Sequence, residues 1–140
     1  MPDKVIRRAL SIRQPWAVLV VKKIKPIEIR TRRAPAHIIG TRVYIQASLT
    51  IDRAPLKVIE LSAPYHLATG TIIGSGILVE CREYRDRELW VADADKHLNC
   101  IEWFEPPLYG YCFEDIEEFE AVPCRGYLGL FEVPDSVILP

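Results

Sequence analysis

Three charged side chains lie close together near the start of this 140-residue chain, in the pattern K-x-x-E-x-R formed by Lys25, Glu28 and Arg30. Ile27 and Ile29 alternate with the last two charges, which predicts a β-strand. On that strand Glu28 and Arg30 share one face, roughly 7 Å apart, and Lys25 lies in the preceding turn. Arg30 would pair with Glu28 and fix its carboxylate, which leaves Lys25 as a free cation.

This combination suits the recognition of a nucleotide. A fixed carboxylate accepts hydrogen bonds from the amino group of a base, and a lysine can contact a phosphate or polarise a carbonyl. The alternative is a structural ion pair that covers the end of a helix. We favour a functional cleft, because core packing does not require three charges to converge on one side of a strand.

The residues before this pattern predict the elements that position it. Leu10 and Ile12 alternate with small or polar neighbours, as in a strand with one buried face. Pro15 suits the first position of a helix, and residues 16–21 are apolar all round, which predicts a helix buried on every side. Pro26 prevents the helix from continuing into the charged strand.

Residues 10–17 read LSIRQPWA and residues 23–30 read KIKPIEIR. These two segments resemble the signature of the ASCH family, L-S-I-x-x-P-W-A followed by G-x-K-x-x-E-x-R, and the resemblance spans nearly the whole chain. The one departure is Lys23, where the family has glycine. If that position needs a left-handed helix cap, a lysine costs about 1 kcal/mol there.

The resemblance implies an α+β fold, a PUA-like small β-barrel flanked by short helices, as a single domain over residues 1–140. It also implies that the chain binds RNA or a modified nucleoside in a cleft beside the barrel. The residues predicted to bind this ligand are Ser11, Gln14, Trp16, Lys25, Glu28, Arg30, Arg32 and Arg33.

A second function implied by the resemblance is metal-independent hydrolysis of N4-acetylcytidine, which small bacterial members perform with a lysine, a threonine three residues later and a glutamate on a later strand. Here Lys25 matches the lysine, Glu28 occupies the threonine position, and Glu80 is the counterpart of the glutamate. The hydroxyl nucleophile is therefore missing, although Lys25 could act directly with Glu28 or Glu80 relaying protons. Other relatives are described as ribonucleases, but no histidine lies near the signature.

The rest of the chain offers a further strand and a third function. Residues 71–84 predict a long strand bent at Gly74 and Gly76, with Glu80 either in a cleft or in water. The acidic residues 114–120 are typical of a solvated turn or helical edge. Together with three aromatic residues expected to be exposed, they could instead form a protein-binding face. These aromatic residues are Trp90, Trp103 and Tyr109.

Composition narrows the function classes. The chain is 49% hydrophobic and 26% charged, and has no apolar run near the roughly 20 residues of a membrane helix, so we expect a cytoplasmic protein. No C-x-x-C pair occurs, which predicts reduced cysteines. His97 and Cys100 lack the second pair of ligands that a zinc site needs, so no metal or other cofactor is expected.

The net charge of -1 hides an asymmetry between the two parts of the chain. Residues 1–53 contain 12 Lys and Arg against 3 Asp and Glu, whereas residues 54–140 contain 6 against 16. The basic part includes the signature, which indicates an anionic partner at that face. The alternative, that the two parts neutralise each other in the fold, has equal weight.

Overall fold

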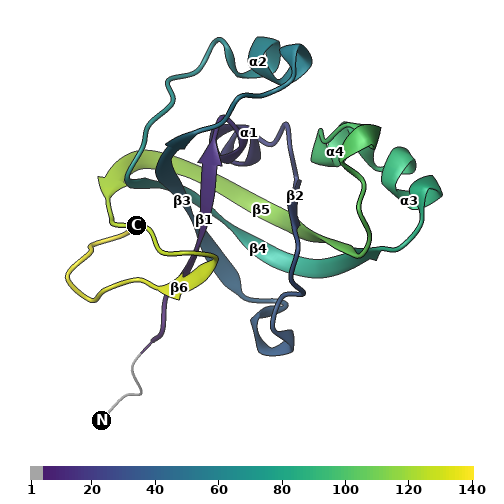
Figure 1. Ribbon diagram of the computed structural model, residues 1–140. Coiled ribbons are helices and arrows are strands. Elements are labelled where there is room, and N and C mark those ends of the chain that lie inside the picture. Colours follow the sequence, from purple (N-terminus) through teal and green to yellow (C-terminus); the bar gives the residue numbers. More distant parts are fainter. Residues whose placement is uncertain (1–4) are drawn as a thin grey trace.

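The computed structural model describes residues 5–140 and contains one curled six-stranded sheet with the strand order β2-β5-β4-β3-β1-β6 (Figure 1). Strands β1 and β3 are parallel, and the other neighbouring strands pair antiparallel. The sheet curls into a half-barrel with β2 and β6 at its two edges. The strands are β1 (Arg8–Gln14), β2 (Ile27–Arg30), β3 (Arg42–Ile51), β4 (Thr71–Tyr84), β5 (Leu108–Pro123) and β6 (Leu130–Glu132).

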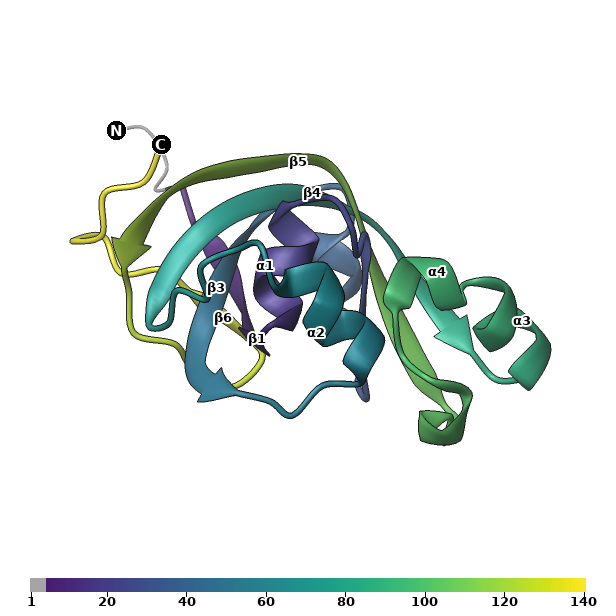
Figure 2. The same ribbon diagram turned by 90° about the horizontal axis from the view of Figure 1, so that it is seen from above.

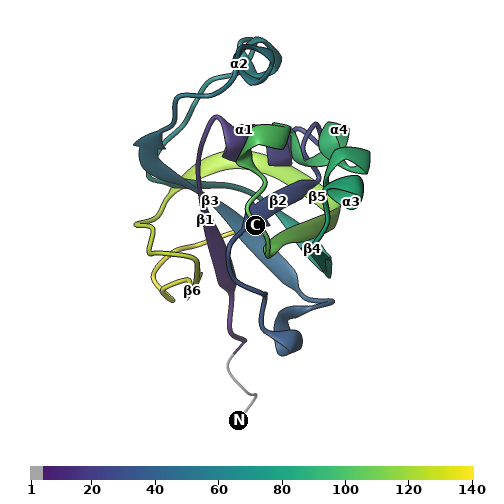
Figure 3. The ribbon, with the colours of Figure 1, turned by 45° about the vertical axis from the view of Figure 1, so that its right-hand side comes forward.

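Short helices surround and fill this sheet: α1 (Trp16–Val21), α2 (Leu56–Ser62), α3 (Arg87–Ala92), α4 (Ala94–His97) and the 3-10 turns η1 (Ala36–Ile38) and η2 (Ile101–Trp103). Viewed from above, α1 lies inside the curl (Figure 2), and the side view shows α2 beyond the end of the sheet, above α1 (Figure 1). Helices α3 and α4 lie together beside β2 and the ends of β4 and β5 (Figure 3). Within residues 5–140, no helix has the length and apolar character needed to cross a membrane.

The α+β fold with a barrel-like sheet confirms the predicted fold class. All six residues of α1 are buried, as the apolar run predicted, because the helix fills the centre of the half-barrel. Strand β4 is curved, as predicted (Figure 2), and its pairing with β5 shifts register between Ile72 and Gly74 and between Ser75 and Ile77. A Cβ atom on Gly74 would lie 2.5 Å from the Glu117 carbonyl oxygen and 2.7 Å from Val21 Cγ1, so only glycine lets β4 pass this close to β5 and α1.

The prediction for the acidic residues 114–120 was wrong. They belong to β5, which at 16 residues is longer than the 14-residue β4. Ile116 is buried and Phe119 packs edge-on against Tyr44 at 6.1 Å, while the intervening carboxylates are exposed. Apolar residues interrupt the acidic run often enough for a strand with one buried face.

The prediction that Trp90 is exposed was also wrong. Its side chain is 1% exposed and stacks on the His97 ring, with ring centroids 4.1 Å apart. Tyr84 meets the Trp90 ring edge-on at 5.4 Å. Trp90 therefore anchors α3 and α4 to the sheet and cannot belong to the predicted protein-binding face, whereas Trp103 is exposed.

The four cysteines carry free thiols. Cys112 and Cys124 are buried, and Cys81 and Cys100 are partly buried. Burial raises the pKa of the Cys112 thiol to about 11. In residues 5–140, no three His, Cys, Asp or Glu side chains are grouped closely enough to hold a metal ion.

The end of α1 explains the departure at Lys23. Pro15 is the residue before the first helical position rather than that position itself, and Lys22 ends the helix. Lys23 follows with φ = 64°, in the left-handed region where a Cβ atom is disfavoured. The glycine of the family signature thus corresponds to a real conformational requirement, and lysine meets it under strain.

We expect Lys23→Gly to raise the free energy of unfolding by about 1 kcal/mol, because glycine adopts positive φ without steric cost. Urea denaturation measures the change. Lys23→Ala is the control, since it removes the same exposed side chain but keeps the Cβ atom and its strain. A Gly variant no more stable than the Ala variant would contradict the explanation.

Candidate functional site

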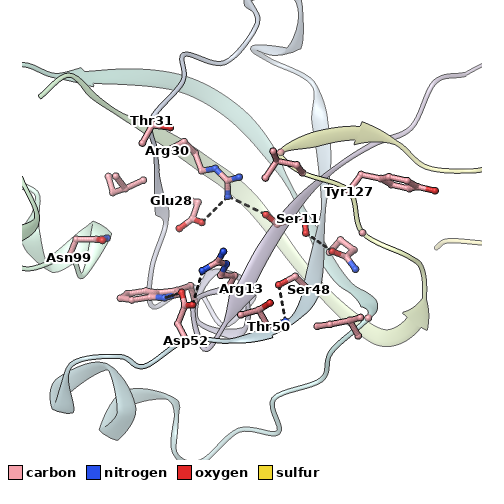
Figure 4. A pocket seen from close by; sticks show the side chains of 18 of the residues that line it. Ser11, Arg13, Glu28, Arg30, Thr31, Ser48, Thr50, Asp52, Asn99 and Tyr127 are labelled. Carbon is pink, nitrogen blue, oxygen red and sulfur yellow. Dashed lines mark hydrogen bonds and ion pairs between the residues drawn. The ribbon is translucent and has the colours of Figure 1, made fainter. Parts of the chain in front are cut away.

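A cleft of about 1090 Å³ opens between β1 and β2, the two strands that face each other where the curled sheet does not close (Figure 4). Ser11 and Arg13 of β1 form one side, and Glu28 and Arg30 of β2 form the other, with their side chains directed into the space between the strands. The end of β3 and residues 125–129 complete the walls. The charged strand face predicted from sequence is therefore part of a cleft.

The carboxylate of Glu28 is held from two directions. Lys25 Nζ donates to Glu28 Oε1 at 2.9 Å, and Arg30 Nη1 contacts Oε2 at 3.4 Å. Arg30 Nη1 also donates to the Ser11 carbonyl oxygen at 3.1 Å, which ties β2 to β1 across the cleft. Glu28 lines the cleft although the residue is only 8% exposed, so its carboxylate has a fixed orientation.

Lys25 is not the free cation that the sequence predicted. Its side chain is completely buried, and Nζ donates to the Ile27 carbonyl oxygen at 2.6 Å as well as to Glu28. The Trp16 ring covers it at 5.5 Å. Burial lowers the pKa of Lys25, and the neighbouring Glu28 carboxylate opposes this effect. Lys25 thus supports Glu28 from behind and does not itself line the cleft.

A chain of amide and hydroxyl groups connects β1 to the segment after β5. Ser11 Oγ donates to Gln46 Oε1 at 2.8 Å, and Gln46 Nε2 donates to the Cys124 carbonyl oxygen at 2.9 Å. The Ser11 amide donates to the Gly129 carbonyl oxygen at 3.1 Å. Gln46 is almost completely buried, and a Cβ atom on Gly126 would clash with it. These contacts fix both ends of residues 124–129 against the strands.

Two tryptophan side chains, Trp16 and Trp103, form a further wall of the cleft. Trp16 and Trp103 meet edge-on with ring centroids 6.1 Å apart, and both line the cleft. Trp16 Nε1 donates to Asp52 Oδ2 at 3.2 Å, and Arg13 Nη1 donates to Asp52 Oδ1 at the same distance. Asp52 therefore holds an indole ring and a guanidinium group in place at the mouth of the cleft (Figure 4).

Gln14, predicted to bind the ligand, lies outside the cleft and is completely buried. Its Nε2 donates to the Ala68 carbonyl oxygen at 2.9 Å, and its Oε1 accepts from the Val18 amide at 3.0 Å. The side chain thereby satisfies an amide in the first turn of α1. Its position indicates a structural role, which is to connect the first turn of α1 to Ala68 in the segment before β4.

Three further predicted residues do not line the cleft. Arg32 and Arg33 lie exposed beyond the end of β2, where Arg33 pairs with Glu83 and stacks over the Tyr109 ring at 5.0 Å. Glu80 is exposed on β4 and pairs with Arg82 at 2.9 Å. A register shift in the pairing of β4 with β5 falls between Leu78 and Glu80, so simple alternation from Gly74 does not give the orientation of Glu80.

Sequence reasoning missed the arginines at the mouth of the cleft, Arg13, Arg53 and Arg125. For Arg13 a signal existed, because it alternates with Ser11 and so shares a face of β1. Arg125 had no such signal, since residues 125–129 are brought to the cleft by tertiary contacts, the pairing of β6 with β1 and the hydrogen bond from Gln46 to the Cys124 carbonyl oxygen.

Asn99 brings the α3–α4 segment to the cleft. Its backbone N–H donates to His97 Nδ1 at 3.0 Å, so Nδ1 carries no proton. His97 Nε2 lies 2.8 Å from the Trp90 carbonyl oxygen and therefore carries the proton of a neutral ring. Burial lowers the pKa of His97. A neutral histidine therefore supports this wall.

The model of the ASCH domain family matches residues 10–133, which include β1 from Leu10 onward and all of β2 to β6. The chain belongs to the ASCH family. The two signature segments thus correspond to β1 with α1 and to the turn with β2, and Glu28 and Arg30 of the second segment form one side of the cleft.

Solved ASCH structures have the same fold. The crystal structure of ASCH from Zymomonas mobilis superposes with a TM-score of 0.66 at 15% identity, covering 92% of this chain and 88% of that one. A tyrosine-to-phenylalanine variant of that protein superposes with a TM-score of 0.66 at 15% identity, covering 92% of this chain and 91% of that one. A serine-to-alanine variant superposes with a TM-score of 0.65 at 15% identity, covering 92% of this chain and 89% of that one. Among curated proteins, none matches the sequence.

We expect Lys25→Met to lower the free energy of unfolding by about 3 to 5 kcal/mol, because it leaves the buried Glu28 carboxylate without its nearer cation. The double variant Lys25→Met/Glu28→Met should lose much less than the sum of the two single variants, since it leaves no unpaired charge. Urea denaturation of all four proteins measures this coupling. Additive losses would show that the pair does not act as a unit.

Proposed function

We propose that the cleft binds a nucleobase of RNA or of a modified nucleoside, with Glu28 accepting hydrogen bonds from the exocyclic amino group of the base. The observation that carries this proposal is the fixed orientation of the Glu28 carboxylate, which lines the cleft while Lys25 and Arg30 hold it. A carboxylate accepts from the amino group of cytosine but not from the carbonyl oxygen of uracil at the equivalent position.

The other walls suit the remaining parts of a nucleotide. The exposed Trp103 offers indole surface of the kind on which bases stack, and the buried Trp16 supports it edge-on. Arg13 and Arg125 are exposed at the mouth, where a phosphate would remain partly in water. Hydrogen-bond acceptor, aromatic wall and basic rim together match a nucleotide better than an uncharged ligand.

Isothermal titration with the four ribonucleoside 5′-monophosphates tests the proposal. The protein should bind a base with an amino group more tightly than uridine monophosphate, and Glu28→Gln should reduce that preference by about tenfold, since a good polar pair contributes roughly 1 to 3 kcal/mol of discrimination. The ratio of the two affinities does not depend on the folded fraction of the variant.

Glu80→Gln is the matched control for this titration, because Glu80 is an exposed carboxylate outside the cleft. It should leave the preference between bases unchanged. A wild-type protein that does not distinguish the four nucleotides, or equal effects of the two substitutions, would contradict the role of Glu28.

Hydrolysis of an N4-acylated cytidine is the second candidate, favoured by the direct hydrogen bond between Lys25 and the cleft carboxylate. Burial lowers the pKa of Lys25, which would help the pair to relay a proton. Two observations weigh against it: Lys25 Nζ is occupied by Glu28 and the Ile27 carbonyl oxygen, and Ser11 Oγ donates to an amide oxygen rather than to a base.

If the binding proposal is right, N4-acetylcytidine incubated with the protein and a chelator should remain intact, as measured by mass spectrometry. Release of cytidine that Lys25→Ala abolishes and Glu80→Gln preserves would instead favour the hydrolase. A circular dichroism spectrum of Lys25→Ala must first show that the variant folds, since the lysine is buried in a charge pair.

A further inference from the structure

The mouth of the cleft is unusually rich in exposed apolar side chains. Of eleven large apolar side chains that are exposed within residues 5–140, four line this cleft: Leu49, Trp103, Tyr127 and Leu128. They come from β3, from η2 and from the segment between β5 and β6. Single exposed apolar residues are normal on protein surfaces, but their gathering around one opening indicates a binding surface.

Leu128 is the extreme case, with 99% of its surface exposed. Its backbone is nevertheless held in place. After it in the chain, Gly129 adopts φ = 72° and its carbonyl oxygen accepts a hydrogen bond from the Ser11 backbone N–H. Before it, Gly126 packs against the Gln46 side chain. The fold therefore presents an apolar side chain to solvent from a fixed backbone at the edge of the cleft.

The neighbouring Tyr127 is also oriented. Its ring packs against Phe131 with centroids 5.4 Å apart, and the guanidinium group of Arg125, which also lines the cleft, lies 5.2 Å from the ring centre. Tyr127 and Leu128 together form an apolar projection beside a basic side chain. Alternation of aromatic or apolar surface with arginine is typical of sites that bind single-stranded nucleic acid.

The size of the cleft points the same way. Its volume of about 1090 Å³ slightly exceeds the roughly 300 to 1000 Å³ of usual small-ligand sites. A free nucleoside would engage Glu28 and the tryptophan wall but has no group for the apolar projection. A strand offers flanking bases for the apolar rim and phosphates for the arginines.

We infer that the cleft takes one base from within a single-stranded stretch of RNA, and that Leu128, supported by Tyr127, inserts beside the neighbouring base in the place the bound base has left. This inference rests on the proposed function and deepens it. Apolar side chains that enter a base stack in this way compensate for the lost stacking of the extruded base. Leu128 is thus a positioning residue that selects a strand over a free nucleoside.

Fluorescence anisotropy and titration calorimetry test the inference with four pentaribonucleotides, AAXAA with each base at X, beside the four 5′-mononucleotides. The pentanucleotide carrying the preferred base should bind more tightly than its mononucleotide. Leu128→Ser should weaken pentanucleotide binding about fivefold or more, as expected for loss of one stacking contact, and should change mononucleotide affinity less than twofold.

Two further variants make the result specific. Ile138→Ser removes an equally apolar side chain that is 80% exposed and lies outside the cleft, and it should have no effect. Leu128→Met, which keeps an apolar side chain, should retain most of the pentanucleotide affinity. Because the Leu128 and Ile138 side chains are both largely exposed, none of the three substitutions should alter the thermal unfolding midpoint.

The outcomes separate the two proposals. Equal pentanucleotide affinity for wild type and Leu128→Ser overturns the inference. The apolar side chains at the mouth would then bind a protein ligand, or only the arginines would contact the strand. Mononucleotide binding that discriminates between bases would, in that case, leave the proposed function intact. If neither mononucleotides nor pentanucleotides bind, the proposed function fails first, and the inference fails with it.

Discussion

A buried lysine bound to a carboxylate is the interaction on which the site depends. Removing an ammonium group from water costs several kcal/mol, so Lys25 can be buried only where oxygen atoms meet its Nζ. The turn after α1 provides them. The amides of Ile24 and Lys25 both donate to the Leu19 carbonyl oxygen, and this directs the side chain toward the Ile27 carbonyl oxygen and Glu28. The strain at Lys23 is one cost of making that turn.

The incomplete closure of the sheet creates the space that this pair faces. Strand β6 covers β1 only from Arg8 to Leu10, so the following residues of β1 have no strand on their outer side. Arg30 bridges the gap by donating to the Ser11 carbonyl oxygen while it holds Glu28. One guanidinium group thus satisfies a strand edge and orients the carboxylate, and the opening remains a cleft instead of a further pair of hydrogen-bonded strands.

Local patterns predicted those parts of the molecule whose structure is decided locally. Alternation and the prolines gave β1, α1 and β2, and the same periodicity placed Glu28 and Arg30 on one face. The burial of Lys25 could not be predicted, because it depends on the Trp16 ring and on strands paired from distant parts of the chain. Arg125 and Leu128 could not be predicted either, since they are far from the signature in sequence and are brought to it by the pairing of β6 with β1 and by the contacts of residues 124–126 with Gln46.

The glutamate at position 28 limits the nucleophilic chemistry that the cleft can perform. A threonine there would leave a hydroxyl group free to attack a carbonyl, with the lysine beside it as an activating base. A carboxylate is a weaker nucleophile, and here it also engages the lysine in a buried pair. A carboxylate held in one orientation is also a selective acceptor, because it can pair with an amino group but not with a carbonyl oxygen. The oriented carboxylate and the occupied lysine are the two features on which we propose binding of a base in preference to hydrolysis.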